Sequence, residues 1–325
     1  MKRSATVTVT VAGIGILALT ACSTGSTPGA QQDTPDNKNV ALVLGVSGSP
    51  LYEALACGAQ AKAEELGLNL DVSSGNAFAA DAQVPVLNAV TAKNPAGAAV
   101  VPTDAQALLP QLRQLTSGGT KLITVDQTLA DDSIASGQVV TDNLAGGAMA
   151  ADEISKLTGG KGKVLVITQP PGSTAQDQRT QGFERKLAEY PGIEYLGAQY
   201  QSDDPQKAAQ IVTATLAAHP DLAAIFSTND QGAVGAVTGL QQANAVGRVK
   251  VIAYDAATAE VNALKNGAIQ ALIAQNPKQE GEVAMTTLAT LIDGGTVERT
   301  QTTDLIVIKS DDLAKADQYE YKADC

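Results

Sequence analysis

The amino-acid sequence predicts an α/β protein made of two doubly wound lobes, each with a parallel sheet covered by helices. Short apolar runs of strand length alternate with longer amphipathic stretches, which is the pattern of repeated βα units. The alternation forms two series of similar size, and the chain of 325 residues is long enough for two lobes with their own cores. Aromatic residues make up only 3 % of the chain. The cores must therefore rest on Val, Ile, Leu and Ala, which suits helices packed on a parallel sheet.

The first series runs from Val40 to Asp126. Its expected strands are 40–45, 68–73, 97–102 and 121–126, and its expected helices are 50–67, 80–93 and 105–117. Ser49 is the expected N-cap of the first helix, with Pro50 at the first helical position, where a missing N–H is harmless. Because each strand is followed by a helix, we expect right-handed crossovers and parallel strands.

The second series follows the segment 139–142. Its expected strands are 162–168, 193–201, 223–228, 249–254, 268–275 and 302–308, and its expected helices are 144–157, 174–189, 205–218, 232–244, 259–266 and 277–292. Asp204 and Asn276 are the expected N-caps of the helices that begin at Pro205 and Pro277.

The N-terminus predicts an exported lipoprotein. Lys2 and Arg3 precede an uncharged apolar stretch, and Leu-Thr-Ala-Cys ends at Cys22, so the parts of a secretory signal peptide are present. Leu-Thr-Ala-Cys also resembles the lipobox of bacterial lipoproteins, which implies cleavage before Cys22 and a lipid on its sulfur. Residues 1–21 are then the signal peptide, and 22–38 are the lipidated cysteine and a flexible polar tether. An uncleaved anchor and an ordinary signal peptide are the alternatives.

The charge and the cysteines restrict the environment and the partners. The formal net charge of −12 argues against nucleic acid and anionic membrane surfaces as partners. If Cys22 carries the lipid, Cys57 and Cys325 remain, and an oxidising compartment favours a disulfide between them. Two free thiols are the alternative.

Motifs of cofactor, nucleophilic and metal sites are missing from the sequence. No P-loop occurs, and no GxGxxG follows a strand. The single histidine, His219, lies between a helix and a strand, away from the expected ligand face, so no base is placed beside a nucleophile. We therefore expect no cofactor, no metal and no catalytic residues of these types.

Polar residues follow most of the expected strands. In doubly wound sheets, ligands bind at the carboxyl ends of the strands. The rule selects Ser47–Ser49, Thr103–Asp104, Asp126–Gln127, Thr168–Gln169, Asn229–Asp230, Tyr254–Asp255 and Gln275. A hydroxyl-rich ligand needs such hydrogen-bonding residues. Asp126 and Asp255 could also act as the paired carboxylates of a glycosidase, so an enzyme remains an alternative.

Several segments together resemble type I periplasmic sugar-binding proteins of the ribose- and galactose-binding kind, over residues 40–310. They are Asn143-Leu-Ala-Gly-Gly147, Arg179-Thr-Gln-Gly-Phe183, the segment 218–230 ending in Asn-Asp, Val251-Ile-Ala-Tyr-Asp255 and Ala271-Leu-Ile-Ala-Gln-Asn-Pro277. The resemblance implies two lobes joined by a three-crossover hinge near residues 140–142, 275–277 and 302–304. Lobe 1 then comprises 39–141 and 276–303, and lobe 2 comprises 142–275 and 304–325.

The resemblance also implies the ligand contacts. Asp126 and Asp255 match acceptors of sugar hydroxyls, Arg179 matches a donor, and Asn229 matches a residue that donates and accepts. The other matching positions are Ser49, Leu51, Tyr52, Tyr254 and Gln275. The alternatives are structural roles without a ligand: helix capping for Ser49 and Asn229, a core position for Tyr52 and a surface position for Arg179.

This chain departs from the family pattern at three positions of the expected site. Gln127 stands where the family often has Arg, and Asp203 stands where it often has an aromatic residue, although Asp203 could also help to cap the Pro205 helix. Leu51 replaces a further aromatic residue. With less stacking surface and fewer cations, an acyclic polyol fits at least as well as an aldopentose. A phosphorylated or acidic ligand fits poorly, because only Arg179 opposes several carboxylates.

The resemblance, together with the N-terminal motif, implies the extracytoplasmic substrate-binding subunit of an ABC importer. Its ligand is a neutral sugar or polyol held in the cleft, its partner is a membrane permease, and it is a monomer anchored to the outer face of the cell membrane by its lipid. The alternatives are a glycoside-acting enzyme and a ligand sensor for a signalling receptor. A LacI-type repressor is disfavoured, because a signal peptide stands in place of a basic helix-turn-helix.

Overall fold

The computed structural model describes Thr8, residues 37–322 and Cys325. Cys22 and nearly all of the expected signal peptide and tether lie outside these residues. Residues 37–325 form one compact unit. Within the described part, no helix combines the length and hydrophobicity needed to cross a membrane.

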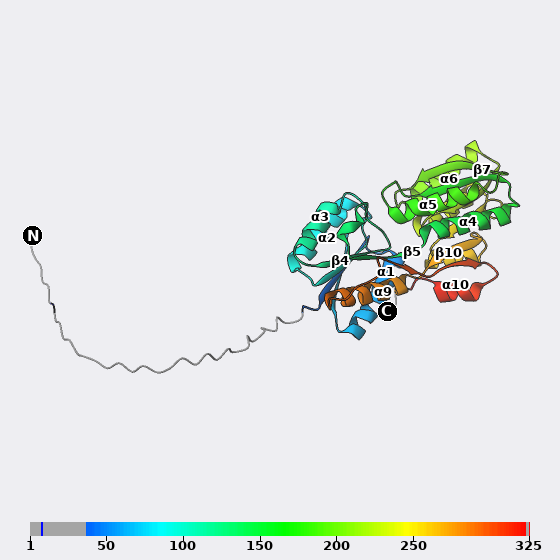
Figure 1. The fold of residues 1–325 in the computed structure, drawn as a ribbon. Helices are drawn as coiled ribbons and strands as arrows, with labels where there is room; N and C mark the ends of the chain where they lie inside the picture. Colours follow the sequence, from blue (N-terminus) through cyan, green and yellow to red (C-terminus); the bar gives the residue numbers. More distant parts are fainter. Residues whose placement is uncertain (1–7, 9–36, 323–324) are drawn as a thin grey trace, which may run out of the picture. The chain divides into compact units, whose positions relative to one another are not determined.

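Two six-stranded sheets form the centres of two lobes (Figure 1). The first sheet has the order β11-β5-β4-β3-β1-β2, and all its pairs are parallel. Its strands are β1 (Asn39–Leu44), β2 (Asn69–Ser74), β3 (Gly97–Val100), β4 (Lys121–Val125), β5 (Gly137–Thr141) and β11 (Thr300–Thr303). The second sheet has the order β12-β10-β9-β8-β6-β7. Its strands are β6 (Gly162–Thr168), β7 (Ile193–Tyr200), β8 (Leu222–Ser227), β9 (Lys250–Tyr254), β10 (Ala271–Gln275) and β12 (Leu305–Lys309).

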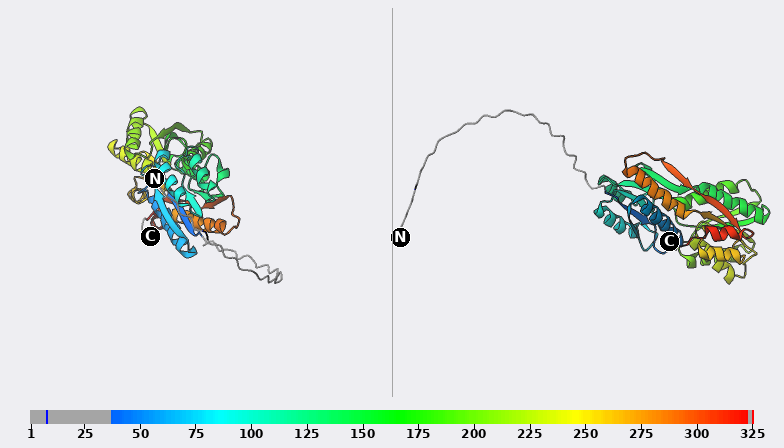
Figure 2. Two further views of the ribbon diagram at one scale, coloured as in Figure 1. Left: turned by 90° about the vertical axis from the view of Figure 1, so that its left-hand side faces the viewer. Right: turned by 90° about the horizontal axis from the view of Figure 1, so that it is seen from below.

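Helices cover both faces of each sheet (Figure 2). In the first lobe, α1 (Pro50–Leu66) and α9 (Pro277–Ile292) pack on one face, and α2 (Ala80–Lys93) and α3 (Leu109–Ser117) pack on the other. In the second lobe, α4 (Asn143–Thr158) and α5 (Thr174–Leu187) pack on one face. The other face carries α6 (Pro205–Ala218), α7 (Asp230–Gln242), α8 (Thr258–Lys265) and α10 (Leu313–Tyr319). The predicted fold class is therefore confirmed.

The prediction of one strand over 302–308 is wrong. This segment forms two strands separated by Asp304, and each belongs to a different sheet. β11 lies parallel to β5, whereas β12 lies antiparallel to β10. The parallel strands of both sheets point their carboxyl ends toward the cleft. The chain leaves the first sheet at the carboxyl end of β11, continues straight across, and enters the second sheet at the edge where its parallel strands end. It must then run against β10.

Smaller differences concern helix ends and the C-terminal segment. Helix α3 begins at Leu109 rather than Ala105, because the Asp104 side chain accepts hydrogen bonds from the Gln106 and Ala107 N–H groups and forms a turn first. Ser49 occupies the N-cap position of α1 but its side chain makes no capping bond. The Asp204 and Asn276 side chains do cap α6 and α9. Helix α10 was not predicted.

The C-terminal segment connects the two lobes. Helix α10 packs on the second lobe through Ala316, and Tyr321 is buried beside it. The chain then ends at Cys325, whose sulfur forms a disulfide with Cys57 on α1 of the first lobe. The C-terminus accordingly lies next to the first lobe (Figure 1).

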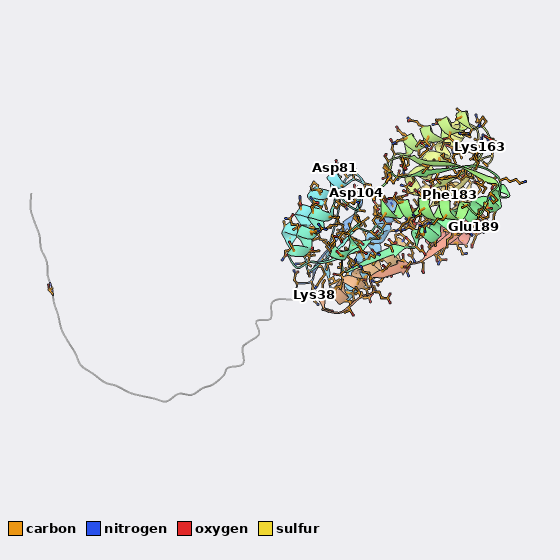
Figure 3. The ribbon with its side chains drawn as sticks, turned by 45° about the horizontal axis from the view of Figure 1, so that its top comes forward. Lys38, Asp81, Asp104, Lys163, Phe183 and Glu189 are labelled. Atoms are coloured by element: carbon orange, nitrogen blue, oxygen red, sulfur yellow. A yellow bond between two sulfur atoms is a disulfide. The ribbon has the colours of Figure 1, made fainter. Side chains whose placement is uncertain are left out.

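The helices α4 and α5 touch through glycines. A Cβ atom on Gly147 would lie 2.0 Å from the carbonyl oxygen of Arg179, and one on Gly182 would lie 2.0 Å from that of Leu144. Phe183, labelled in Figure 3, follows Gly182 on α5, and its side chain packs in the core of the second lobe. This close contact fixes the position of the helix that carries Arg179.

Gly147→Ala should lower the free energy of unfolding by roughly 1–3 kcal/mol, because the added methyl group overpacks a backbone contact that has no room for it. Urea denaturation followed by circular dichroism measures the change. Gln181→Ala, at an exposed position of α5, is the matched control and should be close to wild type. A Gly147→Ala variant as stable as the control would contradict the close contact.

Candidate ligand-binding site

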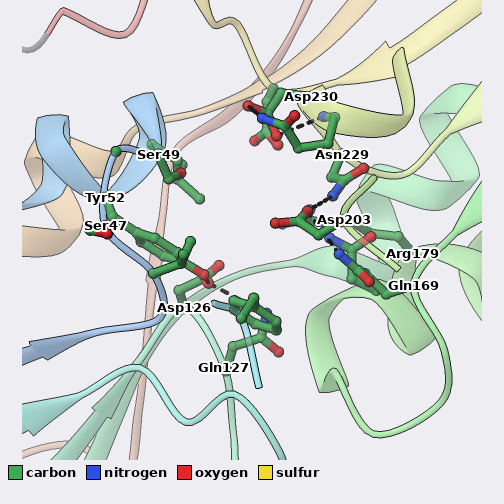
Figure 4. A pocket seen from close by; sticks show the side chains of 17 residues that line it. Ser47, Ser49, Tyr52, Asp126, Gln127, Gln169, Arg179, Asp203, Asn229 and Asp230 are labelled. Carbon is green, nitrogen blue, oxygen red and sulfur yellow. Dashed lines mark hydrogen bonds between the residues drawn. The ribbon is translucent and has the colours of Figure 1, made fainter. Parts of the chain in front are cut away.

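A cavity of about 210 Å³ lies between the lobes. The first lobe contributes Val46, Ser47, Gly48, Ser49, Leu51, Tyr52, Phe78, Asp126 and Gln127, and the second contributes Gln169, Gln176, Arg179, Asp203, Asn229, Asp230, Gln231 and Asp255. Most of these residues follow the carboxyl ends of strands, as the fold requires. Figure 4 shows the polar side chains of the two lobes facing each other across the cavity.

Asp126 directly follows β4 and is almost fully buried. Its Oδ2 accepts hydrogen bonds from the Tyr52 hydroxyl at 3.0 Å and from the Gln127 amide at 3.4 Å. Its Oδ1 has no partner among the described residues. Because an unpaired buried oxygen is costly, this atom is a candidate acceptor for a ligand.

Arg179 is buried on α5 and is held on three sides. Its Nε donates to Asn143 Oδ1 at 2.8 Å, and its Nη1 donates to the Thr228 carbonyl at 2.9 Å. Its guanidinium lies 3.7 Å from the centre of the Tyr254 ring, a cation–π contact. Nη2 has no partner among the described residues and is therefore a candidate donor to a ligand.

Asp255 follows β9 in the second lobe. Its Oδ1 accepts from the Gln275 amide at 2.6 Å and from the Tyr321 hydroxyl at 3.2 Å. Burial raises the pKa of both Asp255 and Asp126, and the charge of Arg179 opposes that rise. The guanidinium therefore favours the ionised form of both carboxyls.

Asp203 forms the outer part of the second-lobe wall. Its Oδ1 accepts from Gln169 Nε2 at 2.9 Å and from Asn229 Nδ2 at 3.1 Å, and its carboxylate points toward the cavity (Figure 4). Asn229 Oδ1 in turn accepts from Gln201 Nε2 and from the Gly232 N–H, so Asn229 caps α7 as well as lining the cavity. Burial raises the pKa of Asp203, and its two amide donors oppose the rise.

The backbone is left-handed at three of these carboxylates. The φ angles are +61° at Asp126, +59° at Asp203 and +87° at Asp255. Non-glycine residues seldom adopt this conformation, and its occurrence clusters at functional sites. Aspartate tolerates it better than most residues do. The repeated strain supports a role of these side chains in binding.

Most of the predicted ligand residues line the cavity, but Tyr254 and Gln275 do not. The Tyr254 ring lies beneath Arg179 in the core, and its hydroxyl bonds to Asn143. Gln275 lies behind Asp255 and joins it to the Thr141 hydroxyl of the first lobe at 2.5 Å. Both residues support residues that line the cavity, because Tyr254 contacts Arg179 and Gln275 donates to Asp255.

Some lining residues were not among the predicted contacts. The strand-end rule had selected Ser47, Gly48, Gln169 and Asp230, but Val46, Phe78, Gln176 and Gln231 were missed. Phe78 lies in the loop after β2, four residues beyond the last residue of that strand, Ser74, so a rule that selects residues at strand ends does not reach it. Gln176 precedes Arg179 by three residues on α5 and thus shares its helix face.

Asp230, at the start of α7, has a pKa raised to about 7 by burial and by the charges of Asp255 and Asp203. The folded chain then holds this proton up to about pH 7, whereas the unfolded chain releases it near pH 4. The folded state therefore loses stability as the pH rises from about 4 to about 7, and this contribution is constant above that range.

Asp230→Asn should remove this loss. We compare the free energy of unfolding of Asp230→Asn with that of the wild type. The difference, variant minus wild type, should be larger at pH 8 than at pH 5 by roughly 1–3 kcal/mol, after allowance for partial solvent exposure. Urea denaturation of both proteins at the two pH values measures the difference. A difference between the proteins that does not change with pH would count against the raised pKa.

Comparisons with known proteins agree with this geometry. The model of the family described as "Periplasmic binding protein domain" matches residues 40–296. The ribose import binding protein RbsB of Salmonella typhimurium is 31 % identical over 273 residues, which cover 83 % of this chain and 90 % of that protein. The D-ribose/D-allose-binding protein of Pseudomonas aeruginosa is 27 % identical, with 88 % and 92 % covered.

Solved structures show the same similarity. An ABC transporter solute-binding protein from Agrobacterium vitis, bound with α-D-tagatopyranose, has a TM-score of 0.86 and 32 % identity, covering 87 % of this chain and 99 % of that one. A periplasmic solute-binding protein from Actinobacillus succinogenes with bound D-allose has a TM-score of 0.79 and 25 % identity, covering 85 % and 99 %. This chain belongs to the periplasmic binding protein family of solute-binding proteins.

Proposed function

We propose that this chain is the extracytoplasmic binding subunit of an ABC importer and that it captures a neutral sugar or polyol between its lobes. The observation that carries the proposal is a pair of buried atoms that have no hydrogen-bond partner among the described residues and that belong to side chains lining one cavity. Asp126 Oδ1 of the first lobe is an acceptor, and Arg179 Nη2 of the second lobe is a donor. Hydroxyl groups both donate and accept, so one polyhydroxy ligand satisfies both atoms.

The charges of the cavity select against acidic ligands. Four aspartates line it, Asp126, Asp203, Asp230 and Asp255, of which Asp230 is the one whose proton is held up to about pH 7, and Arg179 is the cation among the lining residues. A phosphate or carboxylate group would be repelled by this set. Hydroxyl groups donate to carboxylates without adding negative charge, which favours neutral polyhydroxy compounds.

An aromatic surface on the first lobe favours a ring-shaped sugar. The Tyr52 and Phe78 rings lie nearly parallel, at an angle of 4°, with centres 6.4 Å apart. The Phe78 ring also packs against Gly45, where a Cβ atom would approach it to 2.7 Å. The expectation of little stacking surface, based on Leu51, did not include Phe78. With this residue present, a cyclic sugar is favoured over a linear polyol.

The relatives support binding rather than catalysis. The similar proteins named above are import or solute-binding proteins, and the two solved structures hold tagatopyranose and allose. We accordingly assign Asp126 and Asp255 to hydroxyl binding rather than to hydrolysis. We propose Ser49, Leu51, Tyr52, Asp203 and Asn229 as further residues around the ligand.

Transport follows from a hinge between the lobes. In the described residues the chain crosses between the two sheets after β5, after β10 and between β11 and β12. A ligand that bonds to both lobes stabilises the closed form over the open one. The closed lobes then present one surface to the membrane permease. A lipid on Cys22 would keep the protein near that permease and raise its effective concentration.

Asp255→Asn should weaken binding of the ligand by roughly ten- to a hundred-fold, because it removes a charged hydrogen-bond acceptor. Asn also tolerates a left-handed backbone, so the fold should be retained. A thermal-shift screen against pentoses, hexoses, polyols and amino acids measures the effect. At about 100 times its dissociation constant, a ligand adds roughly 2.7 kcal/mol of stability to the wild type.

The control for this screen is Asp81→Asn, at an exposed position of α2, which should retain the full shift. The proposed function is contradicted if no sugar or polyol stabilises the wild type, or if an amino acid alone does so. It is also contradicted if Asp255→Asn responds to the sugar as the wild type does.

Phe78→Ala should weaken binding of a cyclic hexose by roughly two- to ten-fold more than binding of the linear hexitol, because a flat ring loses more stacking surface. Titration calorimetry with both compounds measures the two ratios. Leu157→Ala, at an exposed apolar position near the end of α4, is the control and should change neither. Equal losses for the two compounds would argue against a ring stacked on Phe78.

A further inference from the structure

The N-terminus of α5 lies at the cleft and is not capped by the side chain of its own N-cap residue. Ser173 occupies the N-cap position, but its side chain makes no capping bond within the helix. The first N–H groups of a helix have no intrahelical partner and need an acceptor from elsewhere. Because α5 carries Gln176 and Arg179 into the cavity, the source of that acceptor bears on binding.

The acceptor comes from the other lobe. Oε1 of Gln127, which directly follows Asp126, accepts from the Ala175 N–H at 2.9 Å and from the Thr174 hydroxyl at 3.1 Å. The Ser173 hydroxyl lies 3.4 Å from the same oxygen. Gln127 is 3 % exposed. A side chain of the first lobe thus performs the N-cap role for a helix of the second lobe.

Two backbone contacts lie beside this cap. The Thr128 N–H donates to Thr174 Oγ1 at 2.8 Å. The Ala105 N–H donates to the Gly172 carbonyl at 3.2 Å, next to Asp104 (Figure 3). Gln127, Thr128 and Ala105 belong to the first lobe, and their partners belong to the second. These bonds join the lobes directly, without a ligand atom between them.

We propose that Gln127 and Thr174 form a latch that holds the two lobes in contact whichever ligand occupies the cleft. Gln127 was predicted as a ligand contact, but its Oε1 is engaged by α5, and its Nε2 lies 3.4 Å from Asp126 Oδ2. It is therefore a positioning residue that connects the carboxylate Asp126 to the closed arrangement. Thr174 does not line the cavity, so it acts on closure alone.

Loss of a latch and loss of a ligand contact change the dissociation constants of a set of ligands in different ways. The apparent dissociation constant equals the intrinsic one divided by the fraction of chains in the competent form. Loss of the latch lowers that fraction, so it multiplies every dissociation constant by the same factor. Loss of a residue that touches the ligand changes the dissociation constants unequally. This part of the inference rests on the proposed function.

Thr174→Val in the full chain tests the latch, because valine matches threonine in shape but lacks the hydroxyl. Titration calorimetry with at least three sugars or polyols should show each of them bound more weakly by the same factor, roughly five- to thirty-fold. Thr174→Ser, which restores the hydroxyl, should return the affinities close to wild type. In the Gln127→Ala background, Thr174→Val should have a much smaller effect, because both side chains belong to one set of bonds.

Amide hydrogen exchange tests the latch without any ligand. In the wild type, the Ala105 amide should be protected, and Thr174→Val should speed its exchange although the Ala105 amide bonds to the Gly172 carbonyl rather than to the substituted hydroxyl. Nuclear magnetic resonance resolves this single amide. If the wild type binds no sugar, the proposed function is contradicted. The hydrogen-exchange measurement then still tests the latch, because it needs no ligand.

Three results would overturn the latch. One is a Thr174→Val variant with unchanged affinities. Another is a loss of affinity that differs between ligands by more than the experimental error. The third is an Ala105 amide that exchanges equally fast in the wild type and in Thr174→Val.

Discussion

A buried guanidinium needs hydrogen bonds and opposite charges around it, and Arg179 organises the cleft through that requirement. Tyr254 supplies a ring beneath it, Asn143 and Thr228 accept from it, and one nitrogen remains for a ligand. Its charge opposes the effect of burial on the carboxyls of Asp126 and Asp255. The glycine contact between α4 and α5 brings Arg179 to this place. The helix packing of the second lobe and the electrostatics of the cleft are therefore parts of one arrangement.

The fold supplies the rest of the site by a simple rule, because both sheets end at the cleft. The carboxyl ends of β4, β7 and β9 each lead to an aspartate that lines the cavity, at Asp126, Asp203 and Asp255. All three have left-handed backbones, which direct the carboxylates inward at some cost in local strain. Gln275, Thr141 and Tyr321 then tie Asp255 to the crossings between the lobes. In the proposed function, binding and hinge closure would thus share these hydrogen bonds.

The alternation of apolar runs and amphipathic stretches was enough to predict both lobes, and strand ends were enough to predict Asp126 and Asp255. Other features depended on three-dimensional detail. Tyr254 and Asp255 are neighbours in sequence, yet one side chain enters the core and the other faces the cavity, and a pattern of residue types does not distinguish them. Phe78 was missed because it lies in a loop several residues after β2. The antiparallel strand β12 follows from the geometry of the crossing, which local sequence does not contain.

The central claim is that one polyhydroxy ligand bridges the lobes through Asp126 and Arg179. A crystal structure of the protein with the sugar or polyol that stabilises it most tests this claim most directly. The account predicts ligand oxygens within hydrogen-bonding distance of both Asp126 Oδ1 and Arg179 Nη2, with the ligand enclosed between the lobes. A ligand bound outside the cavity, or one that leaves both of these atoms without a contact, would contradict the account.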